Sequence, residues 1–142
     1  MALQARARQA ETMETPMTHK LLFSNPVFRA GINVTVRKGS KWDDTLSSAE
    51  TVDLATTEGE HIARAIVLGT IFLPFCLLNG SGILKHEHDP RCRDFDGLYD
   101  EMKQVYPGFD KYQFVTVVFF EPEPSYYRKG VDNPGPYPYR ES

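Results

Sequence analysis

The sequence predicts an α+β fold: a small, mainly antiparallel β-barrel with one or two short helices and a C-terminal helix before the last strand. Three observations lead to this fold class. Several short segments in the first half of the chain alternate apolar and polar residues, which is the pattern of strands with one buried face. One clear helical periodicity comes late, at 95–106. A strand-like run follows it directly, so the helix is positioned to close one end of a barrel.

Length and composition indicate one domain with two extensions. The chain has 142 residues, of which 41% are hydrophobic, and this is enough for one core. We predict a flexible N-terminal extension at 1–19, a domain at 20–121 and a Pro/Tyr-rich tail at 122–142. Prolines at the density found in this tail disfavour a sheet interior, so we expect it to be disordered or extended.

Charge and cysteine content narrow the function classes. The net charge of −3 gives no overall attraction to nucleic acid, so any anion site must be a local patch. Cys76 and Cys92 are the only cysteines, which is typical of a reduced, intracellular chain. The most apolar window, 65–78, is broken by Gly69 and Pro74 and is too short to cross a bilayer. We therefore expect a cytoplasmic protein with no membrane association and no cofactor.

Each strand expected before the helix has its own sequence signal. A short apolar opening strand spans 20–23, and a second strand lies between Gly31 and Gly39. The segments 51–57 and 61–73 alternate on both sides of a turn and predict a hairpin. Gly69 marks a bulge or bend in the longer of the two.

The late helix has a cap, an apolar face and a stop. Asp94 or Asp96 is placed to cap its N-terminus, and Pro107-Gly108 ends it. Its apolar residues repeat at helical spacing: Phe95, Leu98, Tyr99, Met102, Val105 and Tyr106. The segment 113–120 is rich in β-branched and aromatic residues on both faces, which predicts a central strand buried on both sides.

The strand between the two glycines carries the first candidate site. Successive side chains of a strand point to opposite sides, so Asn33, Thr35 and Arg37 form a polar row above an apolar underside. An amide, a hydroxyl and a guanidinium in one row suit a base edge or a phosphate, which arginine binds through two parallel hydrogen bonds. The alternative is a polar strand face directed to water.

The turn after this strand carries the second candidate site. Lys38 and Lys41 are placed to contact phosphates, and Trp42 is placed to stack on a base. The alternative is a solvated turn in which Trp42 packs into the core, because indole rings are usually largely buried.

The third candidate is His86-Glu87-His88-Asp89, with Cys92 nearby. Imidazole and thiolate suit zinc, but this spacing matches no closed zinc module, so we predict no metal site. We interpret the segment either as an exposed polar loop or as a loop that faces the substrate. In the second case Glu87 or Asp89 acts as an acid, a base or a hydrogen-bond acceptor for a base edge.

The order of these motifs resembles the ASCH domain, a member of the PUA-like superfamily of small β-barrels. Three pieces carry the likeness over about residues 20–121. The first is Gly31-Ile32-Asn33-Val34-Thr35-Val36-Arg37 followed by Lys38-Gly39, similar to the family's glycine and Thr-x-Arg signature. The second is the hairpin strand with Ala63-Arg64-Ala65-Ile66-Val67. The third is the helix that ends in Tyr-Pro-Gly and the closing strand after it.

The resemblance implies a cleft beside the barrel that holds RNA or a modified nucleoside. One branch of the family hydrolyses the acetyl amide of N4-acetylcytidine with a lysine, a threonine nucleophile and a glutamate. By position the threonine falls on Thr35, but Ile32 or Asn33 stands where the lysine would be. Glu87, Asp89 or neither stands in for the glutamate.

Binding of RNA or of a modified nucleoside is therefore the leading hypothesis, with Arg37 as the gripping residue. One alternative is a small amidohydrolase acting on N4-acylated cytidine, in which Thr35 works with a nearby acidic residue. Another is a ribonuclease that uses His86 or His88. The last is a non-catalytic interaction protein whose Pro/Tyr-rich tail binds a partner.

Overall fold

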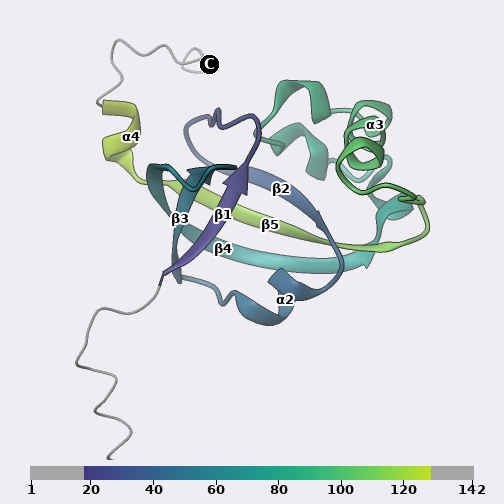
Figure 1. Ribbon diagram of the computed structural model, residues 1–142, viewed down its shortest axis with the longest axis horizontal. Coiled ribbons are helices and arrows are strands. Elements are labelled where there is room, and N and C mark those ends of the chain that lie inside the picture. Colours follow the sequence, from purple (N-terminus) through teal and green to yellow (C-terminus); the bar gives the residue numbers. More distant parts are fainter. Residues whose placement is uncertain (1–17, 129–142) are drawn as a thin grey trace, which may run out of the picture.

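The computed structural model describes residues 18–128. Five strands form one sheet: β1 (His19–Phe23), β2 (Asn33–Lys38), β3 (Thr51–Thr56), β4 (His61–Pro74) and β5 (Phe114–Pro122). Their order across the sheet is β1-β3-β4-β5-β2. β1 runs parallel to β3, and the other three neighbouring pairs are antiparallel. The sheet curls into a half-barrel (Figure 1), which confirms the predicted fold class.

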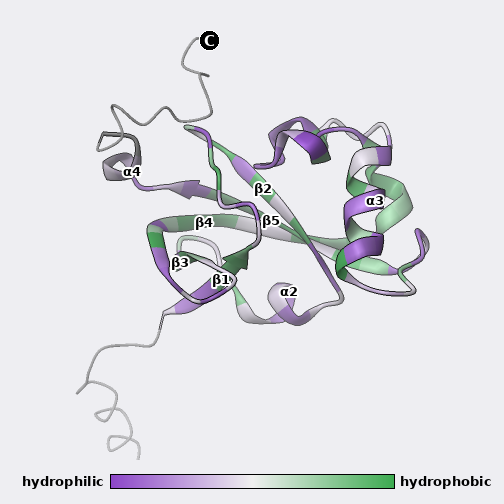
Figure 2. Cartoon of the chain, turned by 45° about the horizontal axis from the view of Figure 1, so that its top comes forward, coloured by the Kyte–Doolittle hydropathy of each residue, from purple (hydrophilic) through white to green (hydrophobic). Residues whose placement is uncertain are grey.

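Three α-helices and three 3₁₀ turns complete the described chain. The helices are α2 (Lys41–Thr45), α3 (Phe95–Val105) and α4 (Pro124–Arg128), and the turns span Phe75–Leu78, Ile83–His86 and Pro90–Cys92. Of the two predicted caps for α3, Asp94 is the one used: its Oδ1 accepts a hydrogen bond from the Gly97 N–H at 2.7 Å. Hydrophobic residues follow one side of α3 and hydrophilic residues the other (Figure 2).

The predicted hairpin is formed by β3 and β4. Its alternation is confirmed on β4, where Ala63, Ala65 and Val67 are buried and the residues between them face solvent. The pairing of β4 with β5 shifts between Val67 and Gly69, which is the bulge expected at this glycine. The alternation thus fixes which face of β4 lines the inside of the curled sheet.

Two hydrophobic clusters pack on opposite faces of the sheet. The cluster inside the curl contains Leu21, Phe23, Phe28, Leu46, Val52, Leu54, Ala63, Ala65, Val67, Val118 and Phe120. The cluster between the sheet and α3 contains Val34, Val36, Phe75, Leu78, Leu84, Cys92, Leu98, Met102, Phe109, Val115 and Val117. β5 contributes to both, so the strand expected to be apolar on both faces is buried on both faces.

β2 is also buried on both faces, so the polar residues Asn33 and Thr35 do not face solvent. Val34 and Val36 belong to the cluster under α3. Asn33 and Thr35 lie opposite Phe120 and Val118 of β5, whose side chains belong to the inner cluster. The row therefore points into the curl of the sheet, and the alternative of a strand face directed to water is wrong for Asn33 and Thr35, which are 0% and 4% exposed.

Both predicted extensions overlap the folded part of the chain. His19 opens β1, and β5 runs through Pro122, opposite Ala65. α4 follows, and its Tyr126 ring lies 5.9 Å from the Phe28 ring, so this segment is helical rather than extended. Residues 1–17 and 129–142, with the remaining predictions for the two extensions, lie outside the described residues. Among the helices of residues 18–128, each is too short or too polar to span a bilayer.

Candidate functional site

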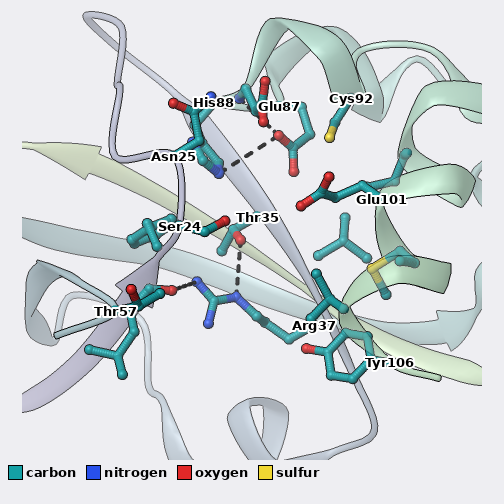
Figure 3. A pocket seen from close by; sticks show the side chains of 17 residues that line it. Ser24, Asn25, Thr35, Arg37, Thr57, Glu87, His88, Cys92, Glu101 and Tyr106 are labelled. Carbon is teal, nitrogen blue, oxygen red and sulfur yellow. Dashed lines mark hydrogen bonds and ion pairs between the residues drawn. The ribbon is translucent and has the colours of Figure 1, made fainter. Parts of the chain in front are cut away.

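A cavity of about 190 Å³ opens between the two edge strands of the sheet and α3 (Figure 3). β1 and β2 are the edges, and the curl of the sheet brings them toward each other. The cavity is lined by Leu22, Phe23, Ser24, Asn25, Thr35, Val36, Arg37, Thr57, Glu87, His88, Asp89, Cys92, Leu98, Glu101, Met102, Val105 and Tyr106. It thus combines an apolar wall from α3 with polar groups from β2 and the 87–89 segment.

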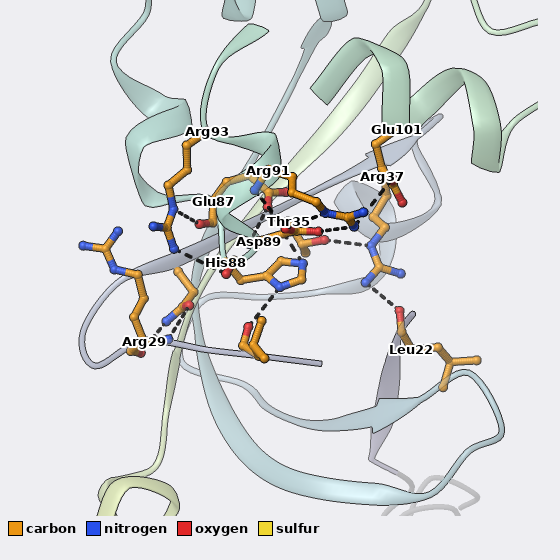
Figure 4. Close-up of polar contacts among 12 residues, drawn as sticks. Leu22, Arg29, Thr35, Arg37, Glu87, His88, Asp89, Arg91, Arg93 and Glu101 are labelled. Carbon is orange, nitrogen blue, oxygen red and sulfur yellow. Dashed lines mark hydrogen bonds and ion pairs between the residues drawn. The ribbon is translucent and has the colours of Figure 1, made fainter. Parts of the chain in front are cut away.

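Arg37 bridges the two edge strands. Its Nη2 donates to the Leu22 carbonyl oxygen of β1 at 2.9 Å, and its Nε donates to Thr35 Oγ1 at 3.1 Å (Figure 4). The guanidinium lies 4.8 Å from the centre of the Phe23 ring, a cation–π distance. Burial lowers the pKa of Arg37 below its usual value, yet a guanidinium stays charged at neutral pH. The cation is therefore held in one orientation, with Nη1 left for a ligand.

The segment around Glu87 docks against the free edge of β2. Glu87 forms a parallel bridge with Val34, and the His88 N–H donates to the Val34 carbonyl oxygen at 3.1 Å. Arg93 Nε donates to the Glu87 carbonyl oxygen at 2.8 Å. These backbone contacts fix the Glu87 side chain beside Thr35 and Arg37 rather than in an exposed loop.

Glu87 carries a neutral carboxyl at pH 7. The residue is 3% exposed, and burial raises the pKa of its carboxyl to about 8. The Asp89 N–H donates to its Oε1 at 2.9 Å, which only partly offsets the burial. Because Oε1 already accepts this bond, the proton belongs on Oε2. Glu87 is therefore a hydrogen-bond donor toward the cavity.

His88 is neutral for the same reason. Its ring packs 4.8 Å from the Phe23 ring and 5.4 Å from the Phe28 ring, and burial lowers its pKa to about 4. Nδ1 lies 3.1 Å from the Val27 carbonyl oxygen, so Nδ1 carries the hydrogen and Nε2 is an acceptor. Nε2 is 3.9 Å from Glu87 Oε1.

Asp89 lines the cavity but is already engaged. Its Oδ1 accepts from the Arg91 N–H at 3.0 Å and from Arg91 Nε at 3.2 Å, and its Oδ2 accepts from Arg91 Nη2 at 2.7 Å. Burial alone would raise the pKa of Asp89, but hydrogen bonds from Arg91 and Asn25 outweigh it and lower the pKa to about 2. This carboxylate holds the 90–92 turn, so of the two acidic residues predicted for the site, Glu87 is the one available to a ligand.

The other predicted binding residues lie away from the cavity. Asn33 is used locally: its Oδ1 accepts from the Arg29 N–H at 3.1 Å, and its Nδ2 donates to the Arg29 and Gly31 carbonyl oxygens at 2.8 and 3.1 Å. Lys38 is exposed at the end of β2. The expected basic turn is the short helix α2, where Lys41 Nζ lies 4.8 Å from the half-buried Trp42 ring.

Five polar lining residues had no sequence signal as site residues: Ser24, Asn25, Thr57, Glu101 and Tyr106. Tyr106 ends the apolar face predicted for α3, and Glu101 lies on the same helix. His86, one of the two histidines considered for a ribonuclease, does not line the cavity, whereas His88 does. Within residues 18–128, no three His, Cys, Asp or Glu side chains lie close enough to hold a metal ion.

Comparison with family models finds no match, and comparison with curated proteins finds none either. Among solved structures, the chain is similar to protein EF3133 from Enterococcus faecalis V583, described by the family model DUF984. The TM-score is 0.51 and the sequence identity 10%, over 84% of this chain and 89% of that one. At this identity the likeness concerns the fold alone, a small α+β domain with a curled half-barrel sheet.

Proposed function

We propose that this protein is an ASCH-type, PUA-like domain that binds a nucleoside, free or as one residue of an RNA, in the cavity between β1, β2 and α3. One observation carries the proposal: Thr35, Arg37 and Glu87 converge on a single cavity. These three come from segments that the ASCH resemblance singles out. A guanidinium, a hydroxyl and a neutral carboxyl are groups that bind the edges of bases.

All three groups have a hydrogen to donate to a ligand. Thr35 Oγ1 accepts from Arg37 Nε, so the hydroxyl hydrogen is left to donate. Arg37 Nη1 donates as well, and so does the protonated Glu87 Oε2. A ligand in this cavity therefore meets hydrogen-bond donors on its β2 side and must present acceptors there. Carbonyl oxygens and unprotonated ring nitrogens of bases are such acceptors.

The size and walls of the cavity suit one planar ring system. A volume of about 190 Å³ equals that of roughly six water molecules in the liquid. Such a volume holds a base and part of a sugar rather than several stacked nucleotides. Val36, Leu98, Met102 and Tyr106 supply apolar surface for the faces of a ring.

Isothermal titration calorimetry with the four common ribonucleosides and short single-stranded RNAs tests the proposal. Arg37→Gln removes a charged donor, so we expect affinity to fall by roughly 10- to 100-fold. Arg37→Lys keeps the charge but loses the bridge to Leu22, so it separates the effect of the charge from the effect of the bridge. Arg64→Gln, on the exposed face of β4, is the matched control and is expected to bind like wild type. Absence of binding, or equal binding by wild type and both Arg37 variants, would sink the proposal.

Hydrolysis of an N4-acylated cytidine is a second candidate, because the Thr35 hydroxyl and the Glu87 carboxyl line the same cavity. No lysine is among the residues of 18–128 that line it, and a protonated Glu87 is an acid rather than a base at pH 7. Incubation with N4-acetylcytidine followed by chromatography separates the candidates. Turnover by wild type and Thr35→Ser but not by Thr35→Val supports hydrolysis; no turnover by wild type excludes it.

A further inference from the structure

Glu101 places a carboxylate on an otherwise apolar wall of the cavity. It shares one side of α3 with Leu98, Met102 and Val105, and all four line the cavity. The carboxylate points into the cavity toward Thr35 (Figure 3). Its closest cation is Arg91, whose Nη2 lies 3.8 Å from Oε1, beyond hydrogen-bond range. Among residues 18–128 nothing donates a hydrogen bond to Glu101, so its acceptor capacity is available to a ligand.

The charges around the cavity leave it neutral overall. Glu87 and His88 are uncharged at pH 7, and Asp89 is neutralised by the bidentate contact with Arg91. The remaining charges of the lining are Arg37, positive, and Glu101, negative. A neutral ligand leaves this balance intact. A phosphate group placed near the Glu101 carboxylate would bring a like charge into the cavity, and Arg37 is the one cation among the described lining residues that could offset it.

The polar groups are also divided by position. The donors Thr35 and Arg37 lie on β2, and the acceptor Glu101 projects from α3 on the other side of them (Figure 3). A ligand that satisfies both walls has acceptors at one end and donors at the other. A ribonucleoside has this arrangement, with carbonyl and ring-nitrogen acceptors on the base and vicinal hydroxyl donors on the ribose. A carboxylate accepts hydrogen bonds from ribose hydroxyls in other nucleotide sites.

We infer that Glu101 binds the ribose hydroxyls of the ligand and makes the cavity selective for free ribonucleosides over phosphorylated nucleotides. The inference rests on the proposed nucleoside-binding function and narrows it, because it removes nucleotides and RNA chains from the preferred ligands. It assigns specificity to a residue on α3, outside the β2 signature.

Calorimetric titration of each common ribonucleoside, its 2′-deoxy form and its 5′-monophosphate tests the inference. For wild type we expect binding of the ribonucleoside at least about tenfold tighter than of the other two, since one charge-assisted hydrogen bond is worth about that factor. Glu101→Gln should lose roughly tenfold for the ribonucleoside, bind the monophosphate more tightly than wild type does, and no longer distinguish ribose from deoxyribose. Glu101→Asp keeps the charge and should still reject the monophosphate.

Asp100→Asn is the matched control. It removes the same charge one residue away, from a side chain that is 72% exposed and does not line the cavity. It should leave all three affinities at the wild-type values. If wild type binds a ribonucleoside and Glu101→Gln shows the same ratios among the three affinities as wild type, this inference is overturned and the proposed function stands. Wild type that prefers the monophosphate or an RNA overturns it as well, and wild type that binds no nucleoside overturns both.

Discussion

The burial of Glu87 predicts a characteristic dependence of stability on pH. The folded pKa of about 8 is above the ordinary value of 4.5, so the folded protein holds a proton that the unfolded chain has released between these pH values. The free energy of unfolding therefore falls as pH rises through this interval. Each pKa unit corresponds to about 1.4 kcal/mol, so the whole interval is worth about 5 kcal/mol.

His88 acts in the opposite direction over part of the same range. Its folded pKa of about 4 is below the ordinary 6.5, so the unfolded chain binds the extra proton and stability rises with pH between these values. The two slopes cancel from about pH 4.5 to 6.5. Above 6.5 Glu87 acts alone, and we expect the free energy of unfolding to fall by about 2 kcal/mol between pH 6.5 and 8.

Urea denaturation followed by circular dichroism at a series of pH values measures this curve. Glu87→Gln keeps a neutral side chain of the same shape and has no proton to lose, so its stability should stay level from pH 6.5 to 8 and should rise from about 4.5 to 6.5, where His88 is no longer opposed. Glu121→Gln, on the exposed side of β5, should follow the wild-type curve. Parallel curves for wild type and Glu87→Gln would refute the neutral carboxyl.

Three further substitutions test the structure around the site. Asn33→Ala removes three hydrogen bonds to the loop at Arg29, so unfolding should cost about 2–3 kcal/mol less in urea titrations, and an unchanged midpoint would contradict this role. Gly97→Ala would press a methyl group onto the Arg91 carbonyl oxygen, so we expect a loss of roughly 1–3 kcal/mol by the same assay; a neutral effect would mean that α3 does not pack as described. Phe75→Ala should lower stability by about 3–5 kcal/mol, because this ring is fully buried under α3, and a loss below about 1 kcal/mol would speak against that packing.

The elements set by local chemistry could be predicted from the sequence. The hairpin, the bulge at Gly69 and the cap at Asp94 follow from alternation, turn residues and side-chain capping, which depend on neighbours in the chain. The parallel pairing of β1 with β3 could not be predicted in this way, since it joins segments about thirty residues apart and leaves no local pattern. That pairing puts β1 at an edge, where Leu22 meets Arg37.

The site residues, too, are predictable where the signal is local and not where it depends on tertiary contacts. Thr35 and Arg37 stand out because alternation and the ASCH resemblance mark the same strand, and both line the cavity. The choice between Glu87 and Asp89 depends on Arg91, which engages Asp89 and leaves Glu87 toward the cavity. The sequence does not mark Glu101 as a site residue, because most glutamates on helices face solvent. Its place in the cavity follows only from how α3 packs beside β2.

The position of bound ligand is the most direct test of the cavity as the functional site. In a titration of ¹⁵N-labelled protein with a ribonucleoside, we expect the largest amide shift changes at Thr35, Val36, Arg37, Glu87 and His88, which surround the cavity. The amides of Lys38, Lys41 and Trp42, outside it, should change little. Shift changes confined to the segment 38–42, or none at saturating ribonucleoside, would contradict a ligand site between β1, β2 and α3.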